Sequence, residues 1–362
     1  MRVKSLTLRD FRNFTVLQAG LSPGINIIYG DNGQGKTNFL EAIYFCATGR
    51  SQRTSSEREL IRFGQREARL RMETAGAYAE RSVDAYISQD KRRGFKGINV
   101  DHIPVKQLSE LIGLLPVVAF APDDLRLIKA GPAERRAFMD RELCQIHPVY
   151  YHALRQYHHA LKQRNHLLKT LQKDRSLTGT VFIWDEQLAA HGCKIMSYRA
   201  AFIRRAGELA RETHGELTGG AEELTMVYKP HITDPAEYPD KLAKGLTRAL
   251  ALGATGSGPH RDDLQFLING SDARVYGSQG QQRTAALSAK LAEIGVIRED
   301  MSAEPVLLLD DVLSELDGRR QAFLLSRIGP LQTVMACTGA EGILRDGGPG
   351  AKVMRMTGGV LE

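Results

Sequence analysis

The sequence predicts an α/β fold interrupted by an inserted antiparallel helical hairpin, and three observations lead to this prediction. The apolar segment GINIIYG at 24–30 is typical of a strand, and a glycine-rich turn then leads into a helical pattern that ends at Gly49. Apolar residues recur at three- and four-residue steps through 143–171 and 181–217, which predicts two helices joined by a turn. From about residue 251 onward, helix and strand patterns alternate as in α/β units.

The order of these patterns predicts three segments. Residues 1–120 contain alternating strand patterns and one clear helix, and we expect them to form the N-terminal half of an α/β domain. Residues 121–250 are expected to form the helical lobe, with a break near Pro148 because proline disrupts a helix interior. Residues 251–362 are expected to complete the α/β domain.

The bulk composition is that of an ordinary globular protein. The 362 residues are 42% hydrophobic and 25% charged, and no run of about 18 apolar residues predicts a membrane span. The segment MRVKSLTLRDFRNF lacks the apolar core of a secretion signal, so a cytoplasmic location is expected. The four cysteines include no CxxC pair, which argues against structural disulfides and zinc. The net charge of +7 weakly favours an anionic partner.

The segment GDNGQGKT at 30–37 matches the phosphate-loop pattern GxxxxGK[ST] completely. Its glycines let backbone amides approach phosphate oxygens, and the following helix directs its positive end at the same phosphates. Lys36 is expected to contact the β- and γ-phosphates of a nucleoside triphosphate, and Thr37 to bind Mg²⁺. A chance glycine-rich turn would explain neither the strand before it nor the helix after it. The predicted nucleotide-binding residues here are Gly30, Asp31, Asn32, Gly33, Gln34, Gly35, Lys36, Thr37 and Asn38.

A second element of a phosphate-transfer site follows much later in the chain. The segment VLLLDD at 306–311 is typical of a buried strand that ends in two carboxylates. Asp310 is placed to hold Mg²⁺, usually through water, and Asp311 to act as a base or to orient the attacking water. The alternative is a core strand that is simply capped by solvated acids. We therefore expect Lys36, Asp310 and Asp311 to be the catalytic residues.

A third segment, SQGQQRTAALSAKLAEIGV, begins at Ser278 and leads small and polar residues directly into a helix. Free amides and a hydroxyl at such a helix start make a second anion site. The arrangement resembles the ABC-type ATPase heads, whose LSGGQ signature agrees here at Ser278, Gly280 and Gln281. Residues 314–317, SELD, stand where those heads carry the D-loop. The resemblance implies a head-to-tail dimer in which each signature covers the partner's ATP.

Within that superfamily the chain resembles the RecF family along nearly its whole length. The resemblance implies an ATP-dependent homodimer that binds double- and single-stranded DNA at gap junctions and acts in DNA repair and replication restart. It also implies cooperation with RecR and RecO to load RecA, and a link to the SOS response. The segments that carry it are LRDFRNF (8–14), GDNGQGKTNFLEAIY (30–44), FAPDDLRLIKAGPAERRAFMDREL (120–143), QRNHLLK (163–169), GPHRDDL (258–264), SQGQQRT (278–284) and LLLDDVLSELD (307–317).

Some residues depart from the general ABC pattern. Asp311 replaces the usual glutamate after the Walker B aspartate, and its shorter side chain suits a slow, switch-like ATPase. Only Thr338 stands where a switch histidine is expected, and no convincing Q-loop glutamine is present. Arg12 is expected to reach the nucleotide, as the equivalent arginine does in SMC-type heads. The alternative for Arg12 is a surface charge beside a core phenylalanine.

The helical region predicts where DNA would bind. Residues 125–212 contain sixteen Lys and Arg against eight Asp and Glu, so this excess accounts for the whole net charge. A positive groove of this kind contacts phosphates, which predicts little sequence preference and a strong salt dependence. The alternative is a solvated helix face. The segment KRRGFK at 91–96 is either a DNA-contacting hairpin tip or a charged turn.

Two further patterns and three other protein classes fit the sequence less well. His158 and His159 are adjacent, so they point apart on a helix and favour surface or packing roles over a metal site. GPHRDD at 258–263 suggests nuclease chemistry, but a structural loop is favoured because no second carboxylate cluster accompanies it. A transporter motor subunit would lack the basic hairpin, and another SMC-type protein would have a far longer coiled coil. A P-loop kinase would not need Ser278 and the D-loop segment.

Overall fold

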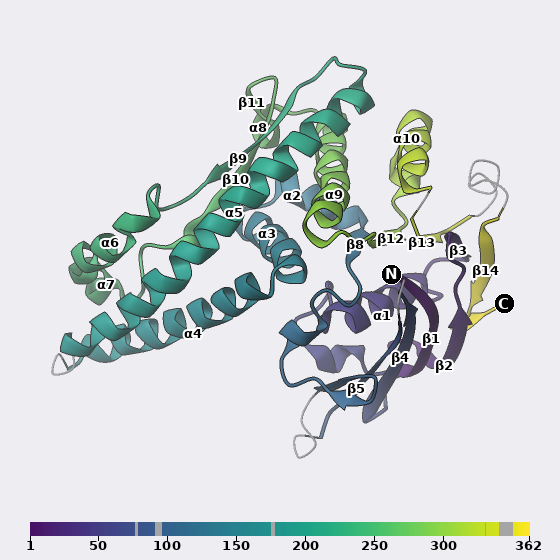
Figure 1. The fold of residues 1–362 in the computed structure, drawn as a ribbon, viewed down its shortest axis with the longest axis horizontal. Coiled ribbons are helices and arrows are strands. Elements are labelled where there is room, and N and C mark those ends of the chain that lie inside the picture. The colour runs from purple at the N-terminus through teal and green to yellow at the C-terminus, as the bar shows by residue number, and fades with distance from the viewer. Residues whose placement is uncertain (77–78, 91–95, 175–177, 330, 340–349) are drawn as a thin grey trace. The chain divides into compact units, whose positions relative to one another are not determined.

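The computed structural model describes residues 1–76, 79–90, 96–174, 178–329, 331–339 and 350–362. These residues form two compact units (Figure 1). The first unit comprises Met1–Asp124 and Ile297–Glu362, and the second comprises Leu125–Val296. The structure groups residues 251–296 with the helical unit, whereas the sequence pattern places them in the last segment. The three segments predicted from the sequence, with boundaries at residues 120 and 250, therefore remain a proposal.

The first unit contains a six-stranded sheet in the order β15-β14-β3-β13-β12-β8. Its neighbours pair in parallel, except for the antiparallel β14–β15 hairpin. The central strands are almost continuously apolar, as expected for a parallel sheet that is covered on both faces. The strands are β3 (Ile25–Tyr29), β8 (Val117–Phe120), β12 (Val306–Asp310), β13 (Thr333–Cys337), β14 (Lys352–Thr357) and β15 (Val360–Leu361).

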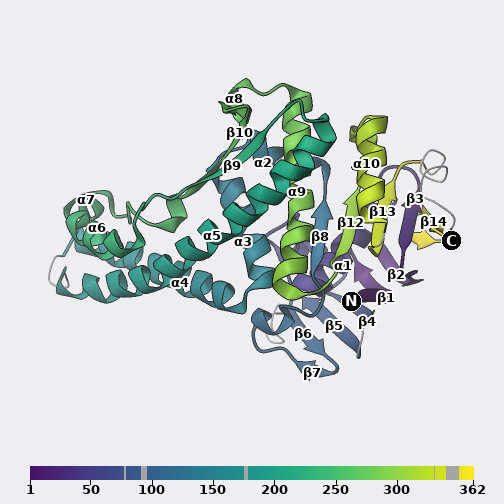
Figure 2. The same ribbon diagram turned by 45° about the horizontal axis from the view of Figure 1, so that its top comes forward.

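A second, antiparallel sheet in this unit has the order β2-β1-β4-β5-β6-β7. Helix α1 (Lys36–Thr48) contacts strands of both sheets, so it forms the layer between them (Figure 2). Nine of its 13 residues are buried, so the helix is covered on more than one of its faces. Helix α10 (Gly318–Ile328) follows β12. The strands are β1 (Arg2–Phe11), β2 (Phe14–Gly20), β4 (Glu67–Ala75), β5 (Glu80–Ser88), β6 (Lys96–Val100) and β7 (Ile103–Pro104).

The second unit is built on the predicted helical hairpin. Helices α4 (Pro148–Leu171) and α5 (Val181–Thr218) pack along each other, as Figure 1 shows. The 24 residues of α4 span about 36 Å and the 38 residues of α5 about 57 Å, so α5 is the longer arm of the hairpin. The break at Pro148 is confirmed: α3 (Pro132–Ile146) ends just before it and α4 begins with it, where proline is tolerated.

A three-stranded antiparallel sheet and shorter helices complete the second unit. Strand β9 packs on α5, and β10 contacts α3. The remaining elements are α2 (Arg126–Lys129), β9 (Leu224–Lys229), α6 (Tyr238–Lys244), α7 (Leu246–Leu252), β10 (Asp263–Ile268), β11 (Ser271–Asp272), α8 (Ala273–Tyr276) and α9 (Gln279–Met301), whose last residues belong to the first unit. None of the helices in the described part of the chain combines the length and apolar composition that a membrane crossing requires.

Candidate nucleotide-binding site

The predicted phosphate loop connects β3 to α1 at the carboxyl edge of the parallel sheet. Two of its glycines are required by the backbone. A Cβ atom on Gly30 would lie 2.3 Å from the carbonyl oxygen of Met356, and Gly35 adopts a φ of +115° as it caps the first turn of α1. Asp31, Asn32 and Gly33 form the exposed crest of the loop. The local pattern of strand, turn and helix is therefore the one that the sequence predicts.

Two strand turns, one near each end of the chain, hold the phosphate loop by hydrogen bonds to Gln34. The side-chain amide of Asn13, in the β1–β2 turn, donates to the carbonyl oxygen of Gln34 at 2.9 Å. The side-chain oxygen of Gln34 accepts from the backbone N–H of Gly358 at 2.5 Å, in the turn between β14 and β15. Sequence reasoning missed these two supports. The signal for the second was the alternation in KVMRMTGGVL, where a Gly-Gly turn joins two short strands.

The hydroxyl and the carboxylate that were predicted to hold magnesium lie next to each other in the folded chain. Thr37 donates from Oγ1 to Oδ1 of Asp310 at 2.8 Å, although the two residues lie 273 positions apart. The nearly buried Lys36 directs its Nζ at the carbonyl oxygens of Gly30 and Asp31, at 2.7 and 2.8 Å. Hydroxyl and carboxylate oxygens are the ligands that Mg²⁺ prefers, so this donor set fits the ion. The chain thus brings Lys36, the predicted phosphate ligand, and Thr37 and Asp310, the predicted magnesium ligands, to one edge of the sheet.

The Walker B carboxylates differ in environment. Burial raises the pKa of Asp310, and the hydrogen bond from Thr37 opposes that shift. Asp311 adopts a left-handed φ of 51°, which is strained for a residue with a Cβ atom, and its N–H donates to the carbonyl of Ala336 at 2.9 Å. Its carbonyl in turn accepts from the Ser314 hydroxyl at the start of the predicted D-loop. Strand β12 accordingly ends at Asp310, one residue before this change of backbone conformation.

A buried glutamate orients two arginines beside the loop. Glu41, on α1, is 1% exposed and accepts from Nε and Nη2 of Arg12 at 2.9 and 2.8 Å. It also accepts from Ser51 at 2.6 Å and from Arg53 at 3.3 Å. Arg53 donates to the side chain of Asn38 as well, at 2.8 Å. Sequence reasoning proposed Arg12 but missed Glu41 and Arg53; the available signal was a single acid within an otherwise apolar stretch of helix.

These arginines border a hollow of about 920 Å³ that opens beside the phosphate loop. Asn13 and Asn38 line it next to the loop, and a run of basic residues continues away from the loop. The hollow therefore presents positive charge to any anion that is held by the loop. The basic lining residues are Arg12, Arg53, Arg58, Arg62 and Arg66.

The predicted signature lies in the second unit. Ser278 is exposed immediately before α9, and Gly280 and Gln281 occupy the first turn of that helix. Ser278 and Gln281 cap the helix reciprocally: the Gln281 N–H donates to Ser278 Oγ at 3.2 Å, and Gln281 Oε1 accepts from the Ser278 N–H at 2.8 Å. The free backbone amides of this turn have the character of an anion site.

The basic residues of the helical region fall into two groups. Arg135, Arg164 and Arg199 are almost fully buried and form ion pairs with carboxylates of their own unit, so they are unavailable to an external anion. In contrast, α4 contains no acidic residue and carries exposed basic side chains at seven-residue intervals, which places them on one face of the helix. These are Arg155, Lys162 and Lys169.

The GPHRDD segment is part of a buried polar network. Arg199 donates to the carbonyl of Pro259 at 2.7 Å and to Asp262 at 2.9 Å. His260 accepts from the Tyr157 hydroxyl at Nδ1, at 2.6 Å, and burial lowers its pKa to about 4. Asp263 accepts a bidentate pair from Arg135. These contacts explain the segment as a structural loop of the second unit.

No group of three His, Cys, Asp or Glu in the part of the chain that the structure describes is arranged to hold a metal ion. His158 and His159 are both exposed on α4, where they contact Tyr157 and Trp184 respectively by their ring edges. Most of KRRGFK lies outside the described residues. Its last residue, Lys96, donates to the carbonyl of Gly49 at 2.9 Å and pairs with Glu57.

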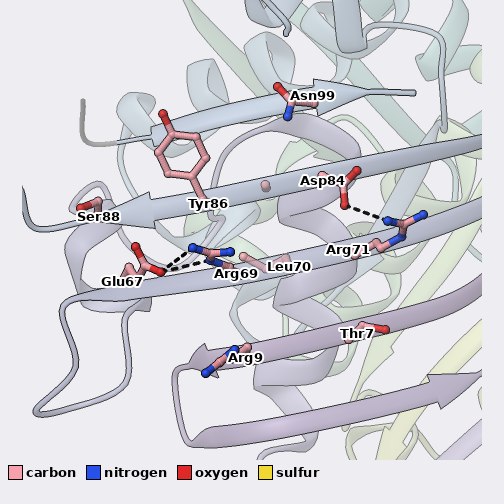
Figure 3. Close-up of a pocket in the computed structure, with 11 residues that line it drawn as sticks. Thr7, Arg9, Glu67, Arg69, Leu70, Arg71, Asp84, Tyr86, Ser88 and Asn99 are labelled. Carbon is pink, nitrogen blue, oxygen red and sulfur yellow. Dashed lines mark hydrogen bonds and ion pairs between the residues drawn. The ribbon is translucent and has the colours of Figure 1, made fainter. Parts of the chain in front are cut away.

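A second hollow, of about 670 Å³, lies on the antiparallel sheet of the first unit (Figure 3). Its charged residues already pair along and across the strands: Arg69 binds Glu67, and Arg71 lies 3.7 Å from Asp84. The hollow shares no lining residue with the phosphate loop or with the Walker B strand. It is therefore a feature separate from the nucleotide site.

Comparison with known proteins gives a consistent result. The model of the RecF/RecN/SMC N terminal domain matches residues 2–338. The chain is 46% identical over 362 residues to the DNA replication and repair protein RecF of Lachnoclostridium phytofermentans, covering 100% of this chain and 99% of that protein. It is 43% identical over 362 residues to RecF of Agathobacter rectalis, again covering 100% and 99%.

Solved structures agree with these relatives. The recombination mediator protein RecF of the RecFOR pathway, solved with ATP, superposes with a TM-score of 0.91 at 32% identity, covering 100% of this chain and 97% of that one. An Smc head bound to the C-winged helix domain of ScpA superposes with a TM-score of 0.58 at 15% identity, covering 100% and 96%, which shows a common fold only. The fold is thus that of an ABC/SMC-type ATPase head. Together, the matched domain and the relatives over the whole length show that this chain belongs to the RecF family.

Proposed function

We propose that the protein is an ATP-operated clamp that dimerises on ATP binding and then holds DNA during recombinational repair. The observation that carries this proposal is the hydrogen bond between Thr37 and Asp310, which brings together the two distant motifs that were predicted to bind phosphate and magnesium. RecF solved with ATP, which covers nearly the same length, supports ATP as the nucleotide. The alternative is another SMC- or ABC-type DNA-associated ATPase, with which the fold would also agree.

In this proposal the phosphate loop from Gly30 to Asn38 wraps the triphosphate. Lys36, which now donates to two backbone carbonyls, would donate to phosphate oxygens instead, and Thr37 and Asp310 would hold Mg²⁺, which would supply charge stabilisation at the phosphates. Arg12, held by Glu41, adds positive charge beside the loop. Asp311 orients the attacking water, and its short side chain keeps hydrolysis slow, so the ATPase acts as a timer rather than as a metabolic enzyme.

The second unit supplies the rest of the proposed site to a partner. The Ser278 hydroxyl and the backbone amide of Gly280 would meet the partner's γ-phosphate in a head-to-tail dimer, while Gln281, whose own N–H donates to Ser278 Oγ, would hold that hydroxyl in place. DNA would lie along the basic face of α4, with double- and single-stranded parts at a gap junction. RecR and RecO would cooperate with the clamp to load RecA, with consequences for replication restart and the SOS response. A cytoplasmic location is part of this proposal, since the clamp would act on the chromosome.

Sedimentation with and without ATP tests the dimer. Lys36→Met should weaken ATP binding about 10- to 100-fold, since the variant has no charge to donate to the phosphates. Ser278→Arg should bind ATP as the wild type does but remain monomeric, because its bulk and charge occupy the partner-facing helix start. If the Ser278 variant forms the ATP dimer normally, the shared-site model is wrong.

The DNA-binding role of α4 is tested by salt dependence. Replacing Arg155, Lys162 and Lys169 by Gln should reduce the slope of log affinity against log salt by about one for each phosphate that is no longer neutralised. Dimerisation by ATP should be unchanged. The matched control replaces Arg69, Arg71 and Arg81, which are ion-paired on the sheet of the first unit, by Gln. An equal slope change in the control would exclude a specific role for α4.

A further inference from the structure

The signature segment is joined to the C-terminal end of α5 by a chain of hydrogen bonds. The side-chain nitrogen of Gln281 donates to Oε1 of Glu222 at 2.9 Å. Oε2 of the same carboxylate lies 3.1 Å from Nε2 of His214, in the last turns of α5. Both ends of this link are within the second unit. Glu222 therefore bridges the signature helix and the longest helix of the unit.

The carboxylate determines which way the Gln281 amide faces. A glutamine amide has a donor end and an acceptor end, whereas an ionised carboxylate only accepts. With Glu222 on one side, the nitrogen of Gln281 must face Glu222, and the oxygen then faces the Ser278 N–H, from which it accepts at 2.8 Å. A reversed amide would lose both hydrogen bonds. Glu222 thus secures the reciprocal cap that holds Ser278 at the start of α9.

The opposite end of the link is anchored in the core. His214 and Ser288 are both 0% exposed, and Nδ1 of His214 lies 3.3 Å from the Ser288 hydroxyl. Ser288 donates to the carbonyl of Thr284 at 2.8 Å, one turn earlier in α9. Gln281 and Ser288 are seven residues apart, so they lie on the same face of α9. The link consequently fastens the first turns of α9 to α5 at two points.

We propose that Glu222, backed by His214, is a positioning residue that orders the signature segment for the partner's triphosphate. The inference rests on the proposed function only in assigning that ligand to the segment. Glu222 does not touch the nucleotide; it keeps the Ser278 hydroxyl and the neighbouring amides in one arrangement. Because α5 is also one arm of the basic hairpin, the same link connects that arm to the signature.

The test compares Glu222→Gln with Glu223→Gln. Glu223 is the neighbouring residue, is exposed and lies 3.8 Å from Arg211, so its variant removes the same charge without touching the link. Glu222→Gln should raise amide hydrogen exchange of residues 278–284 in the nucleotide-free monomer about tenfold, because the acceptor loses its charge and a neutral amide no longer fixes which way Gln281 faces. The ATP dimer should dissociate about tenfold more readily, while the affinity of the phosphate loop for ATP stays within about twofold.

A swap of the two side chains makes the test independent of any general loss of stability. Gln281→Glu alone places two carboxylates against each other and should disorder the segment. Combining it with Glu222→Gln restores a donor opposite an acceptor, and the new carboxylate can still accept from the Ser278 N–H. The double variant should recover exchange and dimerisation to within about threefold of the wild type. A double variant no better than the sum of the single variants overturns the inference.

The two readouts separate this inference from the proposed function. If the wild type does not dimerise with ATP, the shared-site model fails, while faster exchange in Glu222→Gln still supports the positioning role. If the wild type dimerises, but Glu222→Gln matches Glu223→Gln in exchange and in dimerisation, the positioning role is wrong and the shared-site model stands.

Discussion

Replacing Arg199 by Met should reduce the free energy of unfolding of the second unit by about 3–5 kcal/mol. Its side chain is 2% exposed and donates to Asp140 at 2.8 Å and to Asp262 at 2.9 Å. Asp262 is itself fully buried. Without the guanidinium, two carboxylates would remain in a poorly solvated site with their main counter-charge removed. Nearby hydroxyl and amide donors, such as Tyr228, cannot replace a full positive charge.

Chemical denaturation followed by far-ultraviolet circular dichroism measures this effect. Because the chain has two compact units, the transition that belongs to the second unit should move separately from the other. The matched control is Arg205→Met on the same helix, since Arg205 pairs with Glu208 at the surface with 42% of its side chain exposed. The control should change stability by no more than about 0.5 kcal/mol. Equal effects of the two variants would contradict a central role for the buried network.

Replacing Asp310 by Asn should lower ATP hydrolysis about 10- to 100-fold while raising the stability of the nucleotide-free protein. The first effect follows from removing the carboxylate that we propose as a ligand of Mg²⁺. The second follows from the pKa of Asp310, which burial raises above the ordinary value of 3.8. A raised pKa means that the folded state disfavours the charged form. The destabilisation caused by the charged Asp310 is absent at low pH and develops as the pH rises above about 3.8. The gain in stability from Asp310→Asn should therefore be larger at high pH than at low pH.

Thermal denaturation at pH 4 and pH 8, together with phosphate release, checks both parts of this prediction. Asp101→Asn is the control, since a hydrogen bond from Arg81 lowers the pKa of that carboxyl. The Asp101 variant should therefore lose stability at pH 8 and keep its ATPase activity. If Asp310→Asn is also less stable than the wild type at pH 8, the carboxylate stabilises the empty site and the argument from burial is wrong.

Local patterns account for most of what the sequence predicted correctly. The strand, turn and helix around Lys36 depend on neighbouring residues, and so does the break at Pro148. The amphipathic spacing in α4 and α5 predicted the hairpin for the same reason: periodicity directly reports which face is buried. The pairing of Thr37 with Asp310 was predictable because parallel strands place their carboxyl ends at one edge.

Non-local arrangements could not be read from such patterns. The charge count over the helical region treats every arginine alike. In the folded chain, however, Arg135, Arg164 and Arg199 are buried and form ion pairs with carboxylates from other segments. Glu41 shows the same limitation, because it lies on helix α1 whereas its partner Arg12 lies in the turn between β1 and β2. The link from His214 through Glu222 to Gln281 joins three segments, and no single spacing reports it. Only the folded chain shows which charges meet.

The support beneath the phosphate loop has a consequence for how the protein is made. The loop around Gly30 is synthesised early, but one of its two supports, the backbone N–H of Gly358, is translated 328 residues after Gly30. At ribosomal speeds of about 5–20 residues per second, that delay is roughly 15 to 65 s. During this interval the nascent chain contains the phosphate loop but lacks the hydrogen bond from Gly358 to Gln34. Translation that stops short of β14 would therefore leave a chain with every nucleotide motif but an incomplete ATP site.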